Sequence, residues 1–371
     1  MIGFAAAAAL LLGMANGAND NFKGVATLLG SGSMSYRRAL AWATIATLLG
    51  SLTALVLGSA LSRSFAGAGL LPASFDAPGA FLGAVGIGAA ATVLLASRLG
   101  FPVSTTHALL GGLVGAGMIA SAGRLHYGVL AQRFVLPLLL SPAIAFLVAS
   151  VLYPAARRIA ARAARTREVC LCVAAPVVAT VGGAAAVSLR TMGAPQFVVA
   201  SAEACRTHRA TRLAGIDPVR ARDAIHAFSG GLVSFSRGLN DTPKIAALLL
   251  AGSAIPSAYG SLAIALAIAL GGWWGAGRVA RTMSFDLVSL GPGQGAAANL
   301  VTAGLVIGAS WLAFPVSMTH VAVGSMAGTG ARQGRAHWAA LRSVALAWGL
   351  TLPLGAALSA AAFLLLRRIP A

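Results

Sequence analysis

The sequence is poor in charged residues, and acidic residues are the scarcest of them. Only 9% of the 371 residues are charged, with 8 Asp and Glu against 27 Lys and Arg, while 58% are hydrophobic. A soluble core needs far less apolar surface, so this composition excludes an ordinary soluble domain. The apolar runs are long and lack the alternation typical of barrel strands. The sequence therefore predicts an all-α polytopic membrane protein.

Cysteine is also scarce, and the patterns of common catalytic and metal sites are missing. Cys170, Cys172 and Cys205 are too few for a disulfide framework, and they have no nearby fourth ligand for a metal ion. No Ser/His/Asp catalytic set stands out, and no GKS or GKT sequence follows a strand. We expect no enzyme activity, no cofactor and no metal other than a coupling sodium ion.

The net charge of +19 does not indicate a nucleic-acid partner, because the arginines are concentrated between the apolar runs. Cytoplasmic loops of membrane proteins carry this excess of basic residues. The first apolar run has no basic segment before it, so we do not interpret it as a cleaved signal peptide. We expect a multi-pass protein of the cytoplasmic (inner) membrane, surrounded by the lipid bilayer and either monomeric or homo-oligomeric.

Five apolar stretches occur in each half of the chain, which predicts about 10–12 membrane segments. Those of the first half are Ile2–Gly30, Ala39–Leu61, Gly79–Ala96, Val103–Ala120 and Val129–Tyr153, and those of the second are Ala224–Leu250, Ser257–Gly277, Leu287–Ala313, Val316–Gly330 and Trp338–Leu366. The stretches that open at Ser104 and Ser317 are short, which suits re-entrant segments. Because five is an odd number, the two halves are expected to have inverted topology.

Loop charges agree with inverted halves in part. Arg37 and Arg38 follow the first stretch of one half, whereas the equivalent loop of the other half, Gly252–Pro256, carries no charge. Five arginines fit the positive-inside rule poorly under this topology, namely Arg63, Arg124, Arg133, Arg367 and Arg368. The balance favours two inverted-topology repeats.

A basic segment separates the halves. We therefore divide the chain into membrane repeat 1 (residues 1–154), a cytoplasmic linker (residues 155–222) and membrane repeat 2 (residues 223–371). Within the linker, Leu171–Leu189 is uncharged and long enough for a membrane helix, but its short Val- and Ala-rich runs suit strands equally well. Arginine clusters flank it on both sides, and a single crossing would put one cluster on the wrong face. We favour a small β-containing insert over an extra helix.

Two motifs occur twice in the chain, in the same order. Gly17–Lys23 (GANDNFK) corresponds to Gly238–Lys244 (GLNDTPK), and Phe101–His107 (FPVSTTH) corresponds to Phe314–His320 (FPVSMTH). This arrangement indicates an internal duplication. The glycines and asparagines of the first motif suit a break in the helix, where freed backbone groups meet a ligand, and the second copy repeats the pattern.

Each copy of the first motif places an aspartate and a lysine at i,i+3 within an apolar stretch, so the pair can share one helix face. Two interpretations apply to Asp20 with Lys23 and to Asp241 with Lys244. Each pair is either a neutralised ion pair that only tolerates burial, or a site where the carboxylate holds a cation or proton and the ammonium faces an anion. Charges at membrane depth are costly, and their duplication favours the second interpretation.

The second motif predicts a helix N-terminus, with Ser104 and Ser317 as N-caps after a proline. Free N–H groups and hydroxyls at such an end also suit an anion. His107 and His320 are either proton carriers or packed histidines bonded to a neighbouring carbonyl, and the sequence leaves both alternatives open.

These motifs resemble those of the inorganic phosphate transporter (PiT) family, whose hallmark is a duplicated GAND-type motif. The resemblance covers both repeats but not the linker. It implies an inverted-repeat symporter that binds phosphate near the membrane midplane and couples uptake to Na⁺ or H⁺. By motif position it places Asn19, Asp20, Asn240 and Asp241 at the ion and substrate site, and Ser104, Thr105, Thr106, Ser317 and Thr319 at the substrate. With the lysines added, the candidate substrate-binding residues are Asn19, Lys23, Ser104, Thr105, Thr106, Asn240, Lys244, Ser317 and Thr319, and the candidate coupling-ion residues are Asp20, Asn21, Asp241 and Thr242.

The chain departs from this family pattern in two respects. Family members often carry Asn three residues after the motif aspartate, where this chain has Lys23 and Lys244, and Met318 stands where the first copy has Thr105. Two fixed ammonium groups supply the positive charge that bound sodium ions would bring to two aspartates. We therefore hypothesise that the lysines replace one or more coupling sodium ions, which lowers Na⁺ dependence and allows proton coupling.

Taken together, these patterns predict secondary active import of inorganic phosphate by alternating access of the two repeats around a central site. Sulfate or another tetrahedral oxyanion suits the same lysines and hydroxyls. An anion channel, a different class of protein, would need a continuous polar path, whereas the polar residues cluster at two symmetric places.

Overall fold

The computed structural model describes residues 2–67, 69–72, 75, 79–163, 169–174, 196–201, 211–215, 218–250 and 255–368. Two compact units make up the chain. The larger, which we call the helical unit, contains Met1–Tyr153 and Ile225–Ala371, and the smaller contains Pro154–Ala224.

The helical unit follows the ten apolar stretches of the sequence. In the first half the helices are α1 (Ile2–Asp20), α2 (Ala26–Gly30), α3 (Tyr36–Leu57), α4 (Ser59–Phe65), α5 (Gly79–Leu99), α6 (Thr105–Ala120), α7 (Tyr127–Val129), the π-helix η1 (Leu130–Val135) and α8 (Leu136–Ala163). In the second half they are α10 (Pro218–Leu250), α11 (Ser257–Gly275), α12 (Gly277–Arg281), the π-helix η2 (Thr282–Asp286), α13 (Pro292–Trp311), α14 (Met318–Ala331) and α15 (Trp338–Leu366).

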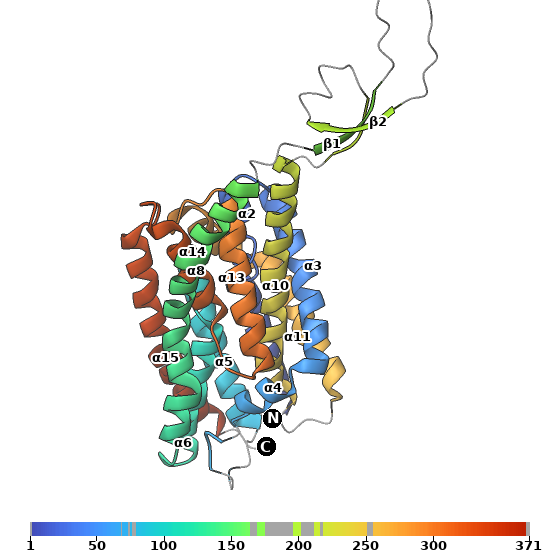
Figure 1. Ribbon diagram of the computed structural model, residues 1–371. Coiled ribbons are helices and arrows are strands. Elements are labelled where there is room, and N and C mark those ends of the chain that lie inside the picture. Colours follow the sequence, from blue (N-terminus) through green and yellow to red (C-terminus); the bar gives the residue numbers. More distant parts are fainter. Residues whose placement is uncertain are drawn as a thin grey trace, which may run out of the picture. The chain divides into compact units, whose positions relative to one another are not determined.

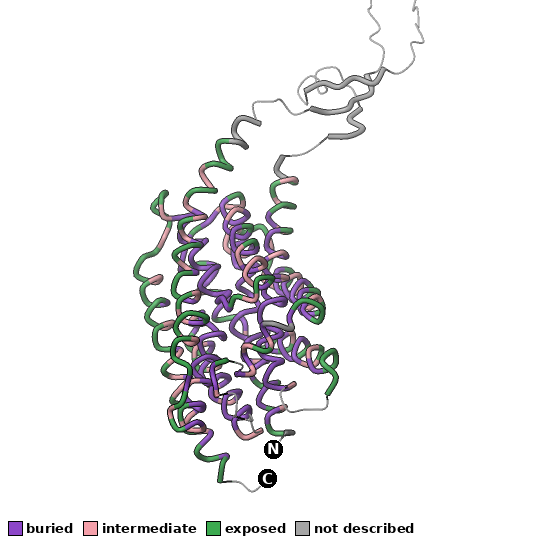
Figure 2. Tube along the Cα trace, turned by 60° about the horizontal axis from the view of Figure 1, so that its bottom comes forward, coloured by how far each residue is buried: buried purple, intermediate pink, exposed green. Residues whose placement is uncertain are grey.

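The surface of this unit is that of a membrane protein. Five helices of the described chain are long and apolar enough to cross a bilayer, namely α3, α5, the continuous segment Tyr127–Arg158, α11 and α15. Large apolar side chains point outward, including Val56 at 82% exposure and Trp274 at 84%, while the buried residues line the interior of the bundle (Figure 2). Water would not tolerate so much exposed apolar surface, so the prediction of an all-α polytopic membrane fold is confirmed.

The first copy of the aspartate motif interrupts a helix, and the second copy does not. α1 ends at Asp20, and turns follow, with the Lys23 N–H donating to the Asp20 carbonyl at 3.1 Å, before α2 begins. α10 runs through the second copy, Gly238–Lys244, with Pro243 inside the helix, so the break expected there is wrong. The copies differ after the lysine, where Gly24 is a poor helix former and Ile245 opens an apolar run that sustains a helix.

The second motif begins a short helix in both copies. Ser104 and Ser317 are N-caps, as predicted, and their hydroxyls accept hydrogen bonds from the backbone N–H groups of His107 at 3.1 Å and His320 at 3.3 Å. α6 has 16 residues and α14 has 14. A helix that crosses the hydrocarbon core needs about 20 residues, so both lengths suit re-entrant segments.

Glycine allows helices of the two halves to meet at their backbones. A Cβ at Gly17 of α1 would lie 2.0 Å from the Ile268 carbonyl oxygen of α11, and a Cβ at Gly271 would lie 1.9 Å from the Met14 carbonyl oxygen. Any larger residue would push α1 and α11 apart. Equivalent approaches join α6 to α15 at Gly115 and α8 to α14 at Gly328.

The smaller unit contains a three-stranded antiparallel sheet in the order β2-β1-β3, formed by β1 (Val169–Ala174), β2 (Gln196–Ser201) and β3 (Thr211–Gly215). The register pairs Val169 with Ser201. Of the uncharged stretch Leu171–Leu189, residues 171–174 belong to β1, and residues 175–189 lie outside the described residues. The cytoplasmic position of this linker stays a prediction.

Candidate functional site

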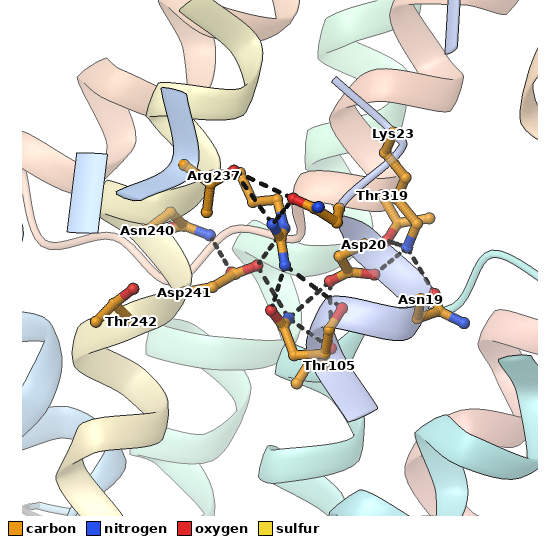
Figure 3. A network of polar contacts seen from close by, with 12 residues as sticks. Asn19, Asp20, Lys23, Thr105, Arg237, Asn240, Asp241, Thr242 and Thr319 are labelled. Atoms are coloured by element: carbon orange, nitrogen blue, oxygen red, sulfur yellow. Dashed lines mark hydrogen bonds and ion pairs between the residues drawn. The ribbon is translucent and has the colours of Figure 1, made fainter. Parts of the chain in front are cut away.

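The two copies of both motifs converge on one buried cluster of polar side chains (Figure 3). α1 and the turns after it supply Asn16, Asn19, Asp20 and Lys23, α10 supplies Arg237, Asn240, Asp241 and Lys244, and the starts of α6 and α14 supply Thr105, Thr106 and Thr319. Each of these side chains is at most 4% exposed. Uncompensated polar groups are expensive at this depth, so their partners define the site.

Lys23 is surrounded by four oxygen atoms. Its Nζ donates to Asn19 Oδ1 at 2.8 Å, to the Val103 carbonyl at 2.7 Å and to Thr319 Oγ1 at 2.5 Å. It also forms an ion pair with Asp20. The ammonium thus joins its own motif to the second motif of both halves.

Lys244 has the equivalent partners in the other copy. Its Nζ donates to the Val316 carbonyl at 2.9 Å and to Thr106 Oγ1 at 3.0 Å, and it lies 3.7 Å from Asp241 Oδ1. Both aspartate–lysine pairs of the sequence analysis are therefore in contact. Each lysine bonds to a carbonyl of its own half and to a threonine of the other half.

The two aspartates are linked by Asn16. Its Nδ2 donates to Asp20 Oδ2 at 2.9 Å and approaches Asp241 Oδ2 at 3.2 Å. Thr105 Oγ1 also donates to Asp20 Oδ2 at 3.2 Å, and Asn240 Nδ2 donates to Asp241 Oδ1 at 2.9 Å. Every oxygen of both carboxylates therefore has a hydrogen-bond or ionic partner, as buried carboxylates require.

Arg237 is a third buried cation, and the sequence analysis missed it. Its guanidinium donates to Asn16 Oδ1 at 2.6 Å and to Asn21 Oδ1 at 3.0 Å, and its Nε lies 4.0 Å from Asp241 Oδ2. Asn16 was missed as well. The signal was present, because each lies four residues before a motif aspartate, one helical turn away on the same face.

Four predicted residues lie at the edge of the cluster instead of within it. Asn21 bonds to Thr44 and Arg237, and Thr242 bonds to Ser51 at 2.7 Å, so both face α3. The hydroxyls of Ser104 and Ser317 are used as helix caps. Met318, which replaces the hydroxyl of Thr105, packs in an apolar cluster with Ala145, Val233, Ala303, Val306 and Val321.

The two histidines lie against each other behind the cluster. The rings of His107 and His320 have centroids 4.6 Å apart, and His320 Nδ1 donates to the Leu138 carbonyl at 3.1 Å. The packed alternative therefore describes His320, whose ring also lies 4.0 Å from that of Trp348. A proton-carrying role for either histidine stays a prediction.

The charge of the cluster suits an anion. With ordinary charges, three basic side chains face two acidic ones, which leaves a formal excess of one positive charge in a site closed to water. Hydroxyls and the N-termini of α6 and α14 add hydrogen-bond donors. A transition metal, by contrast, would find no group of three His, Cys, Asp or Glu side chains anywhere in the described ranges.

Comparisons with known proteins identify the family to which the chain belongs. The chain is 28% identical over 361 residues to a protein of Mycobacterium tuberculosis named "Probable low-affinity inorganic phosphate transporter", covering 93% of this chain and 73% of the relative. A protein of the same name in Mycobacterium leprae is 26% identical and covers 96% of this chain and 75% of the relative. The solved structure of a sodium-dependent phosphate transporter has the same fold, with a TM-score of 0.77, 22% identity and coverage of 100% of this chain and 99% of that one. The sequence profile of the phosphate transporter family matches residues 16–359, and the chain therefore belongs to that family.

Proposed function

We propose that the protein is a secondary active transporter that imports inorganic phosphate across the cytoplasmic membrane. The observation that carries the proposal is the pair of buried lysines, each of which bonds to elements of both halves. Such a junction between repeats is where transporters bind their substrates. Family membership supports phosphate as the substrate.

In this proposal phosphate binds between the starts of α6 and α14. The ammonium groups of Lys23 and Lys244 and the hydroxyls of Thr105, Thr106 and Thr319 are its ligands, together with the amides of Asn19 and Asn240. In the closed arrangement these donors are satisfied by protein oxygens, such as Thr319 Oγ1 donating to the Val103 carbonyl at 2.6 Å. Phosphate oxygens would replace those acceptors, so phosphate binding and separation of the starts of α6 and α14 would be coupled. A monoprotonated phosphate would also donate to Asp20 or Asp241.

The coupling ion is H⁺ or Na⁺, and we propose that fixed cations lower the need for Na⁺. Sodium sites in such transporters are built from carboxylate, amide and carbonyl oxygens at helix breaks. Near Lys23 such oxygens already accept hydrogen bonds from its ammonium group. The side-chain oxygens of Asn16, Asn21 and Thr47 accept hydrogen bonds from Arg237. Asp20 and Asp241 remain the residues proposed to take up the coupling charge.

The halves are proposed to work as inverted repeats that expose the site to each side in turn. Matching contacts support this: Asn19 Nδ2 donates to Ser97, and Ser310, the equivalent of Ser97, donates to Asn240 Oδ1. Thr106 and Thr319 each bond to the valine carbonyl of the opposite copy.

The test is uptake of radiolabelled phosphate into proteoliposomes, with and without Na⁺ and with and without a pH gradient. We expect saturable uptake that the pH gradient drives in the absence of Na⁺ and that an excess of sulfate inhibits weakly. Uptake of sulfate without phosphate would refute the substrate, and flux that follows voltage alone without coupling would make the protein a channel.

The lysines are tested by Lys23→Asn combined with Lys244→Asn, which restores the residue that family members often carry. We expect phosphate uptake by this variant to become Na⁺-dependent. If Na⁺ dependence and the KM for phosphate both stay at their wild-type values, the lysines do not replace sodium.

A further inference from the structure

A pocket of about 500 Å³ lies beside α4. α4 is at one end of the helical unit (Figure 1). The walls of the pocket come from α4, η1 and the segment before α14, and the lining includes Arg63, Gly69, Arg133, Phe134 and residues 312–315. Both arginine side chains are exposed, and neither forms an ion pair with any described residue. The pocket is thus lined by two guanidinium groups that have no ionic partner among the described residues.

Under the topology predicted from the sequence, these arginines lie on the side where membrane proteins carry few basic residues. Arg63 and Arg133 belong to the five arginines that fit the positive-inside rule poorly. A basic residue on the non-cytoplasmic side does not help to orient the protein in the membrane. Binding of an anionic ligand in the pocket would explain why the arginines are there. One guanidinium group can donate hydrogen bonds to two oxygens of a phosphate at once, which an ammonium group cannot do with the same geometry.

One aromatic layer separates this pocket from the buried site. Phe134 lines the pocket and packs edge to face on Phe65, with ring centroids 5.6 Å apart. The ring of Phe65 in turn lies 5.7 Å from Lys244 Nζ. Both phenylalanines are buried, at 0% and 2% exposure, so they close the direct route from the arginines to the lysine.

The pocket also touches the backbone that holds Lys244. Its wall at Leu312–Pro315 leads directly into Val316, whose carbonyl accepts a hydrogen bond from Lys244. A ligand at the arginines would therefore lie beside the segment that leads into α14 and holds the acceptor of Lys244.

We infer that this pocket is an outer entry site for a phosphate group, bound by Arg63 and Arg133 and separated from the buried site by Phe65 and Phe134. The inference rests on the proposed function. An oxyanion is concentrated by the arginines, waits in the pocket and passes to Lys244 when the two rings part. Electrostatic capture of this kind raises the rate of substrate encounter more than the rate of later steps.

The kinetic test is phosphate uptake by the double variant Arg63→Gln/Arg133→Gln. At low ionic strength we expect the KM to rise about tenfold with little change in the maximum rate, and we expect high salt to remove most of the difference. The variant Arg63→Lys/Arg133→Lys should retain much of the wild-type KM. The matched control is Arg124→Gln, because Arg124 follows α6 at the same end but does not line the pocket.

A second test reads binding without transport. Phenylglyoxal modifies exposed arginines, and mass spectrometry of the wild-type protein in nanodiscs reports the modification of each one. We expect inorganic phosphate to protect Arg63 and Arg133 but not Arg124 in nanodiscs of a phosphate-free galactolipid. Protection that appears only with phosphatidylglycerol and without added phosphate would assign the pocket to a lipid headgroup instead of the free anion.

The two tests separate failure of the pocket from failure of the proposed function. If the KM is unaltered and neither inorganic phosphate nor phosphatidylglycerol protects the arginines, the pocket is not a phosphate site. Measured phosphate uptake would still support the proposed function. Protection by phosphate in a protein that takes up none would support the pocket and refute transport. For the aromatic layer, Phe65→Ala should make Lys244 several times more reactive toward a water-soluble amine reagent than Phe65→Leu does, and equal reactivity would refute the partition.

Discussion

The two copies of the aspartate motif are built alike around their lysines and differently one turn earlier. Lys23 and Lys244 bond to equivalent atoms, a valine carbonyl of their own half and a threonine hydroxyl of the other. Four residues before each aspartate, however, the first copy has Asn16 and the second has Arg237, and these two side chains bond to each other at 2.6 Å.

The duplication has therefore kept the contacts of the lysines but not the charge of the site. A fully symmetric site would have two lysines against two aspartates and no net charge. The guanidinium of Arg237 adds a positive charge where the halves meet, so the protein itself carries a charge that suits an anion. The symmetric part of the site defines the geometry, and the asymmetric part sets the charge.

The largest effect is expected from removing the lysines one at a time. Lys23→Met leaves Asp20 without its ion pair, and the loss of one partner of a buried pair costs about 3–5 kcal/mol. Lys244→Met should cost less, about 1–3 kcal/mol, because Asp241 keeps Asn240, Asn16 and Arg237 as neighbours. Unfolding in detergent micelles measures both values, and equal losses would show that the two copies are energetically equivalent.

A second prediction makes the two copies alike at the position where they differ. Arg237→Asn removes the excess positive charge, and the attraction between that charge and an anion within about 10 Å is about 1.5–3 kcal/mol at an effective dielectric constant of about 20. We therefore expect the KM for phosphate to rise roughly 10- to 100-fold. Arg237→Lys, which keeps the charge but loses the paired bonds to Asn16 and Asn21, is the control. If Asn and Lys at this position have the same effect, hydrogen bonding and not charge is what Arg237 contributes.

The smallest effect concerns Met318, the apolar counterpart of Thr105. Met318→Thr places a hydroxyl in the apolar cluster around Val233 and Val306, and burial of an unpaired hydroxyl costs about 1–3 kcal/mol. The volume-conserving Met318→Leu should cost less than about 1.5 kcal/mol. Thermal unfolding in detergent compares the two, and a more stable Thr variant would mean that its hydroxyl finds a partner, as that of Thr105 does in Asp20.

Much of the fold and part of the site could be predicted from the sequence because the information is local. The order of apolar stretches predicts the helices, the i,i+3 spacing predicts the aspartate–lysine pairs, and proline followed by Ser104 or Ser317 predicts a capped helix start. The role of Arg237 could not be predicted this way, because its partner Asn16 lies 221 residues away.

Two predictions concerned the side to which a residue points. Asn21 and Thr242 each follow an aspartate directly, and one residue turns a helix by about 100°. Thr242 therefore contacts Ser51 of α3, and Asn21, in the turn after α1, contacts both Thr44 of α3 and Arg237. Their role at a coupling ion stays a prediction. The absence of a break in α10 also has a local cause, because Ile245 follows the lysine where the first copy has Gly24. A residue-by-residue comparison of the copies predicts such differences better than either copy alone.

The glycine contacts between α1 and α11, α6 and α15, and α8 and α14 have a consequence for how the protein moves. Each contact joins a helix encoded before the linker to one encoded after it, at backbone distance. Helices packed this closely cannot slide or part without breaking the contact. If the proposed transport cycle operates, we expect its moving bodies to be pairs of helices with one member from each half of the chain. Separately expressed halves would lack their packing surfaces, and they would have to assemble with each other before either could work.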